Sequence, residues 1–121
     1  MIAWLIAVGM RLRFDGRLAR DLDATLELRV RLMRRRRPVS LRLLIRQGVL
    51  EVRPGAAPDA AARATVVLSD MLRLAIGAIG WPELLSSGRL ELAGDPFLAL
   101  RFPAMFRLPA VGSRLAANAP T

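Results

Sequence analysis

The sequence contains no cysteine, no histidine, no tyrosine and no lysine. The lack of cysteine excludes disulfides, thiolate catalysis and cysteine-ligated zinc or iron–sulfur sites. The lack of histidine and lysine removes the side chains that most often transfer protons near neutral pH or form Schiff bases. We therefore expect a protein that is not an enzyme, with no catalytic residues, no metal site and no cofactor.

Every one of the 19 positive charges is an arginine, and against ten carboxylates they give a formal net charge of +9. Apolar residues make up 54% of the chain, which excludes a disordered polyelectrolyte despite that charge. A chain of 121 residues has the size of one domain, so we treat residues 1–121 as a single folding unit. The use of arginine alone, together with many alanines and leucines, is typical of a GC-rich bacterial genome.

Residues 1–20 are expected to form an N-terminal helix. The apolar run from Ile2 to Val8 is much shorter than the ~20 residues of a membrane span. It also lacks the basic segment that begins a secretion signal. We therefore expect a cytoplasmic protein, while Arg11, Arg13 and Arg17 leave open a peripheral contact with a membrane.

A period of two begins after Asp21, where apolar residues alternate with charged or polar ones up to Leu32. This pattern predicts a strand in a sheet with one covered face and one wet face, the wet face carrying arginines. Four further segments show strand patterns, and turn signals such as Gln47-Gly48 separate them. They are residues 39–46, 49–53, 64–68 and 89–93, of which the first two extend the first strand into an antiparallel meander.

Three helices are expected between and after the later strands. Ser69 is the expected N-cap of a helix over residues 70–79, ended by Gly80. A short helix follows over residues 81–88, and Asp95 caps a last helix that Pro103 should kink or end. Residues 107–121 carry little patterned apolar surface and are expected to form a loose tail.

The order of these elements resembles the sterol carrier protein type-two superfamily over residues 21–106. The residues that carry the resemblance are Leu41 to Val52, Ala64 to Leu72, and above all Ser87 to Asp95, where a glycine, an alternating strand and a Gly-Asp pair precede the last helix. The resemblance implies an α+β fold in which short helices cover one face of a single twisted, mostly antiparallel five-stranded sheet and enclose a hydrophobic cavity. It also implies non-enzymatic binding or transfer of a long-chain lipid, such as a fatty acid, an acyl-CoA, a sterol or an isoprenoid.

The helical part of the chain offers side chains to line such a cavity. Ordinary core packing is the alternative for each of them taken singly, since apolar stripes at helical spacing are common in cores. The candidates are Met71, Leu72, Ile76, Ile79, Trp81, Leu85, Phe97, Leu100, Met105 and Phe106. A second function stays open beside the carrier, namely a module that forms a homodimer, docks on an enzyme partner, or presents a lipid to that partner.

The arginines allow three interpretations: a solvated sheet face, contact with an anionic headgroup or membrane, and nucleic-acid binding. Nucleic acid is disfavoured because aromatic residues are scarce and no recognition motif is present. The candidates for contact with an anionic headgroup or membrane surface are Arg34, Arg35, Arg36, Arg37 and Arg42.

Overall fold

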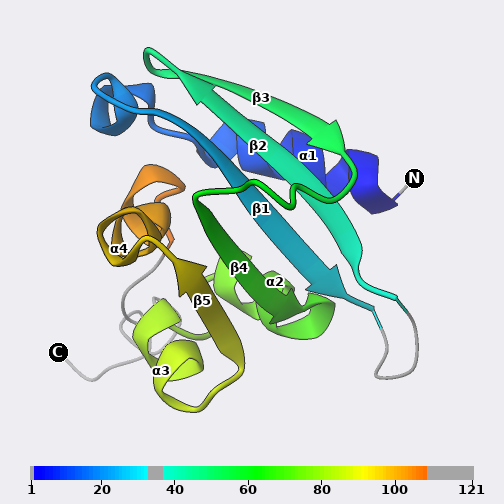
Figure 1. Ribbon diagram of the computed structural model, residues 1–121. Coiled ribbons are helices and arrows are strands. Elements are labelled where there is room, and N and C mark those ends of the chain that lie inside the picture. The colour runs from blue at the N-terminus through cyan, green and yellow to red at the C-terminus, as the bar shows by residue number, and fades with distance from the viewer. Residues whose placement is uncertain (1, 33–36, 109–121) are drawn as a thin grey trace, which may run out of the picture.

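The computed structural model describes residues 2–32 and 37–108, which build one five-stranded sheet with helices packed on one of its faces (Figure 1). The strands lie in the order β3-β2-β1-β4-β5. In chain order the elements are α1 (Ile2–Arg13), the 3-10 helix η1 (Gly16–Ala19), β1 (Asp23–Arg31), β2 (Val39–Arg46), β3 (Val49–Pro54), β4 (Ala62–Val67), α2 (Leu68–Ala75), α3 (Trp81–Ser86), β5 (Leu90–Gly94) and α4 (Pro96–Met105).

The sheet is antiparallel except at one place. Strands β1, β2 and β3 form the expected meander, and β4 pairs with β5 in the antiparallel sense. Strand β4 runs parallel to β1, because the segment after β3 crosses the sheet before it pairs. The prediction of a single, mostly antiparallel five-stranded sheet is therefore confirmed.

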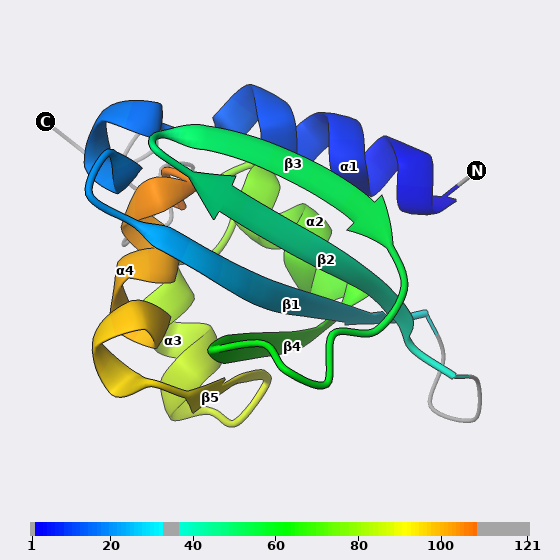
Figure 2. The same cartoon turned by 45° about the horizontal axis from the view of Figure 1, so that its top comes forward.

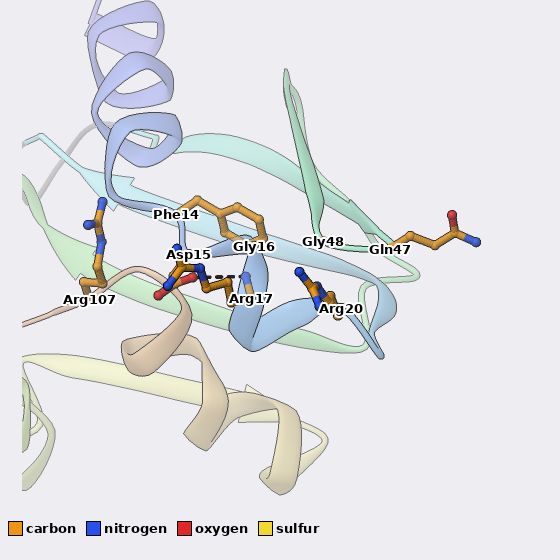
Figure 3. Close-up of a pocket in the computed structure, with 8 residues that line it drawn as sticks. All are labelled: Phe14, Asp15, Gly16, Arg17, Arg20, Gln47, Gly48 and Arg107. Carbon is orange, nitrogen blue, oxygen red and sulfur yellow. Dashed lines mark hydrogen bonds between the residues drawn. The ribbon is translucent and has the colours of Figure 1, made fainter.

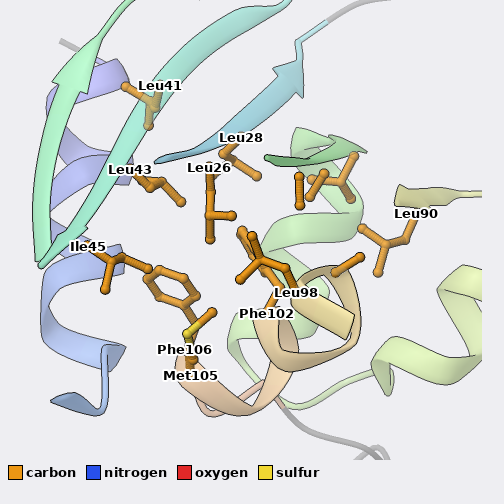
Figure 4. Packing of buried hydrophobic residues seen from close by; sticks show 14 of the residues in the cluster. Leu26, Leu28, Leu41, Leu43, Ile45, Leu90, Leu98, Phe102, Met105 and Phe106 are labelled. Carbon is orange, nitrogen blue, oxygen red and sulfur yellow. The ribbon is translucent and has the colours of Figure 1, made fainter. Parts of the chain in front are cut away.

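The alternation of the strands places their apolar side chains on the face that the helices cover. Leu26, Leu43 and Ile45 are completely buried there, beneath α1 and α4. Figure 4 shows that Phe102 and Met105 of α4 and Phe106, its C-cap, reach this layer. The ring of Phe106 packs against Phe102 and Phe14, with ring centroids 4.9 and 5.4 Å away. This part of the space between the sheet and the helices is thus a filled core.

Every helix differs from the sequence prediction at one end or both. The N-terminal helix expected over residues 1–20 ends at Arg13 and is followed by η1, and α3 ends at Ser86 instead of residue 88. Helix α2 follows β4 without a break, so Val67 is its N-cap and Ser69 lies inside its first turn. It ends at Ala75 because Gly77, at φ 77°, forms a Schellman-type cap in which the amide of Ala78 donates to the carbonyl of Arg73. Helix α4 is capped by Asp95 as predicted, yet it continues through Pro103 to Met105.

Two predicted features lie beyond what the structure describes. The loose tail was expected over residues 107–121, of which only Arg107 and Leu108 are described. Most of the four-arginine turn is also outside the described residues. Among the described helices, none is long and apolar enough to cross a bilayer.

The outer face of the sheet is not uniformly wet, because Glu27 in the middle of it is completely buried. The segment between β3 and β4 runs across this face in front of β1 (Figures 1 and 2) and buries Ala57 as well. The Glu27 carboxylate accepts hydrogen bonds from the Ala57 amide at 3.1 Å and from Arg29 and Arg63 at 2.5 and 3.2 Å. This carboxylate therefore fastens the crossing segment to the sheet.

We expect Glu27→Gln to lower the free energy of unfolding by about 2 kcal/mol at pH 7, because three donors lose a charged acceptor. Burial by itself would raise the pKa of Glu27, but the hydrogen bonds from Arg29, Ala57 and Arg63 outweigh it and hold the pKa below its usual range. The stabilisation is therefore present at neutral pH and is lost as the pH falls through the lowered pKa. Urea unfolding of both proteins at pH 7, 5 and 3 measures the difference, which should shrink toward pH 3.

The matched control is Glu51→Gln, since Glu51 forms an exposed ion pair with Arg53 on the same face. An exposed pair contributes about 0 to 1 kcal/mol, so this change should have little effect at any pH. A Glu27→Gln loss that is equally large at pH 3 would show that the shape of the side chain, and not its charge, fastens the segment.

Candidate functional site

A cavity of about 350 Å³ lies between the sheet and helices α1, α2 and α4. Its floor is the helix-covered face of β1, β4 and β5, and its walls are one side of each helix. The lining consists of Leu5, Ile6, Gly9, Met10, Arg13, Leu28, Ala64, Val66, Leu68, Met71, Leu72, Leu74, Ala75, Leu90, Leu92, Phe102, Pro103 and Leu108. Residues from both ends of the described part of the chain and from its middle therefore meet at this cavity.

Small residues leave this space unfilled beside the packed core. Gly9 faces the cavity from α1, and a Cβ placed on it would have no neighbour within 4 Å. Ala64 contributes only a methyl group to the floor, and Ala75 does the same at the end of α2. Larger side chains at these three positions would fill the volume. The cavity therefore exists because small residues stand at facing positions of α1, β4 and α2.

Arg13 is the one charged residue in the cavity lining. Its guanidinium donates to the backbone carbonyls of Ala75, Phe106 and Arg107 at 3.2, 3.3 and 2.8 Å. These carbonyls lie at the C-terminal ends of α2 and α4, where a cation is favourable to the helix dipole. Arg13 therefore ties α1 to the two other helices that wall the cavity.

Arg107 makes the reciprocal hydrogen bonds to α1. Its guanidinium donates to the carbonyls of Leu12 and Arg13 at 2.7 and 2.8 Å, at the end of α1. The two arginines thus each donate hydrogen bonds to backbone carbonyls of the other's segment. These bonds hold the end of the described chain against the end of α1.

The cavity opens to solvent between α1 and α2. Leu5 of α1 and Leu72 of α2 both line the space, yet they are 57% and 53% exposed. Trp4 of α1 and Ile76, the C-cap of α2, are also exposed. Exposed apolar side chains therefore flank this opening, whereas Arg13 lies where the two helices end.

The site offers little for chemistry beyond binding. No acidic side chain lines the cavity, and the lining contains no hydroxyl group. Among residues 2–32 and 37–108, no group of three acidic side chains is placed so that it could hold a metal ion. The arrangement can enclose apolar surface, and at one end it presents a guanidinium.

No protein-family model and no curated protein matches the sequence. Solved structures do match. Sterol carrier protein 2 like 2 from Aedes aegypti superposes with a TM-score of 0.68 at 20% identity over 85% of this chain and 95% of that one. The chain has the sterol carrier protein 2-like fold. The sterol carrier fold predicted from the order of the elements is therefore confirmed.

Two further solved structures also match this chain. The ubiquinone synthesis protein UbiJ-SCP2 matches with a TM-score of 0.62 at 21% identity, over 88% of this chain and 93% of that one. The stereoselective inverting sec-alkylsulfatase Pisa1 from Pseudomonas sp. matches with a TM-score of 0.63 at 22% identity. The match covers 80% of this chain and only 15% of the sulfatase, so this chain corresponds in fold to one part of that enzyme.

Within this sterol carrier fold, two of the ten proposed cavity residues line the cavity, namely Met71 and Leu72. Met105 and Phe106 are completely buried in the filled core instead. Ile79, Trp81 and Leu85 are partly buried outside the cavity, the first two packed against the core. The other three point largely to solvent: Ile76, Phe97, which is 82% exposed, and Leu100.

The contribution of α1 and of the sheet floor to the lining was not predicted. All of the predicted lining residues follow residue 70, whereas five observed lining residues come from residues 5–13. Gly9 inside an otherwise apolar helix was the available signal, since a glycine there costs about 1 kcal/mol in helix propensity relative to alanine.

Of the five proposed headgroup arginines, the structure describes Arg37 and Arg42, and neither of these two lines the cavity. Arg34, Arg35 and Arg36 lie outside the described residues, and Arg37 is exposed beside them in the sequence. Arg42 is on β2, where it pairs in register with Glu27, so it belongs to the outer face and not to the cavity side. Its Nε is buried and has no hydrogen-bond partner within the described structure.

Proposed function

We propose that this domain binds one long-chain lipid in the cavity between α1, α2 and α4 and performs no chemistry on it. The observation that carries the proposal is the lining, in which 17 apolar residues or glycines accompany a single arginine. A binding site of this kind gains its affinity from burying apolar ligand surface, and its few polar groups set the orientation.

The size and shape of the cavity favour a flexible chain as the ligand. A volume of about 350 Å³ is near the lower end of the ~300 to 1,000 Å³ of small-molecule sites. Met10 and Met71 line it from opposite helices, and methionine adapts to irregular ligand shapes. We therefore place a fatty acid or another single-chain lipid ahead of a rigid, fused-ring sterol.

The comparisons support a lipid in this fold. The mosquito sterol carrier protein has also been solved in a palmitated form, which matches this chain with a TM-score of 0.65 at 20% identity. The likeness to a ubiquinone synthesis protein supports a variant of the proposal in which the bound lipid is presented to a partner enzyme.

Native mass spectrometry of gently purified protein, followed by extraction and analysis of bound lipid, tests the proposal. We expect a single-chain lipid at near one-to-one stoichiometry, or uptake of a fluorescent fatty acid by the lipid-free protein. A lipid-free protein that takes up neither fatty acids nor sterols would overturn the carrier function. It would favour a dimerisation or docking module instead.

A further inference from the structure

A second cleft, of about 560 Å³, lies where the end of α1, the helix η1, the β2–β3 turn and the end of α4 meet (Figure 3). It is distinct from the apolar cavity and has the opposite character, because three arginines line it. Arg17 and Arg20 come from η1 and the residue after it, and Arg107 follows α4.

Two of these arginines lack a counter-charge. Within the described part of the chain, the guanidinium groups of Arg17 and Arg20 have neither an ion-pair partner nor a hydrogen-bond acceptor. The carboxylate in the cleft, Asp15, accepts a hydrogen bond from the backbone amide of Arg17 at 3.0 Å.

One neighbouring carboxylate is paired away from the cleft, and another lies at its edge. Asp21 pairs with Arg101 at 2.9 Å, and Asp23 accepts the amide of Gln47 at 3.2 Å. The three arginines that line the cleft therefore exceed the nearby carboxylates of Asp15 and Asp23 by one positive charge.

Arg107 occupies a position where glycine would be less costly. Its φ of 50° is left-handed, and it sits at the C-terminal cap of α4, where the amide of Leu108 donates to the Pro103 carbonyl. The Arg107 guanidinium is held by the carbonyls of Leu12 and Arg13, as described above. Its position is fixed before any ligand arrives, so it loses little conformational entropy on binding.

The floor of the cleft is equally fixed. Gly16 and Gly48 pack backbone against backbone, so that a Cβ on Gly16 would lie 2.4 Å from the Gly48 carbonyl oxygen. Arg17 and the β2–β3 turn are thereby held at a constant spacing around the opening.

We infer that this cleft binds a phosphate-bearing anion through Arg17, Arg20 and Arg107. Guanidinium groups match phosphate oxygens in a bidentate geometry, and a group with several phosphate oxygens can contact more than one of them. This inference does not rest on the lipid-binding proposal, because its residues and its chemistry are separate from those of the cavity.

The cleft and the cavity nevertheless share a wall. Arg13 and Leu108 line the cavity, whereas their chain neighbours Phe14 and Arg107 line the cleft. The phosphate therefore has two possible sources, a free anion or the headgroup of a lipid whose chain occupies the cavity.

Titration calorimetry with inorganic pyrophosphate at low ionic strength tests the inference. We expect binding to the intact protein and a loss of at least about tenfold in affinity for Arg17→Gln/Arg20→Gln, because each charge-assisted contact contributes about that much. Glutamine keeps the Cβ and Cγ carbons, and both residues are exposed, so the urea unfolding curve should not change.

The matched control is Arg31→Gln/Arg53→Gln, which removes the same charge from two exposed arginines that do not line the cleft. We expect less than a twofold change in pyrophosphate affinity. An equal loss in both variants, or no binding by the intact protein of either pyrophosphate or dodecyl phosphate, would overturn the inference. Displacement of pyrophosphate by dodecyl phosphate but not by dodecanol would identify a lipid headgroup, and simultaneous binding of pyrophosphate and a fatty acid would identify a free anion.

Discussion

Replacing Gly94 with alanine should lower the free energy of unfolding by about 3 kcal/mol or more, since it combines backbone strain with a steric clash. Gly94 ends β5 at φ 95°, and a Cβ there would lie 2.4 Å from the Ala61 carbonyl oxygen and 2.8 Å from the Ala62 Cα. Both of these are backbone atoms, so no side chain can move to relieve the clash. Urea unfolding followed by circular dichroism measures the loss.

Gly88→Ala separates the two causes. Gly88 also has a positive φ, of 76°, but a Cβ on it would meet nothing within 4 Å. It should therefore show only the cost of a left-handed alanine, about 1 to 2 kcal/mol. A Gly94→Ala variant no less stable than Gly88→Ala would contradict the steric argument.

The steric clash in Gly94→Ala should also change the walls of the apolar cavity. The amide of Asp95 donates to the Ala61 carbonyl at 2.8 Å, and Asp95 caps α4. Displacement of Gly94 would move α4, which supplies Phe102 and Pro103 to the cavity. Any Gly94→Ala protein that does fold should therefore bind lipid more weakly.

Replacing Gly9 with leucine should abolish most lipid uptake while leaving the protein folded. The added carbon atoms enter the open space beside Gly9, which is part of the cavity. The helix itself gains up to about 1 kcal/mol, because leucine is a far better helix former than glycine. A fluorescent fatty acid titration should show at least a tenfold loss of affinity, which corresponds to about 1.4 kcal/mol.

Ala93→Leu is the matched control, since Ala93 is exposed on the opposite face of β5. It adds similar bulk far from the cavity, and the affinity for the fatty acid should stay within twofold. A stable Gly9→Leu protein that binds as tightly as the original would show that the lipid site is elsewhere.

The strands were predictable because each carries its own alternation. Strand β1 differs from its expected range by one residue at each end, and β2 coincides with its prediction. Helix limits were less predictable where tertiary structure decides them. Helix α2 begins at Leu68 because it continues directly from β4, which pairs with β1 up to Val67, and no local capping signal records that.

The cavity was much harder to predict than the fold. A side chain such as Phe106 has the same character in a packed core as in a cavity wall, and only the elements opposite it decide which it becomes. The empty volume arises from what is missing at Gly9, Ala64 and Ala75, which lie far apart in the sequence. Large apolar residues therefore indicate the core in this sequence, whereas small residues on facing elements indicate the cavity.

The cavity walls are also the contacts that are most distant along the chain. Residues 5–13 meet residues 71–75 and 102–108 there, whereas the β1-β2-β3 meander joins neighbours in sequence. Contacts between residues that are far apart in the sequence require the closure of long loops, and such contacts form more slowly than local ones. The meander can assemble early and locally, but the cavity closes only when both ends of the described chain have docked. A partly folded chain therefore lacks the cavity, and the proposed binding of a lipid requires the last tertiary contacts to form.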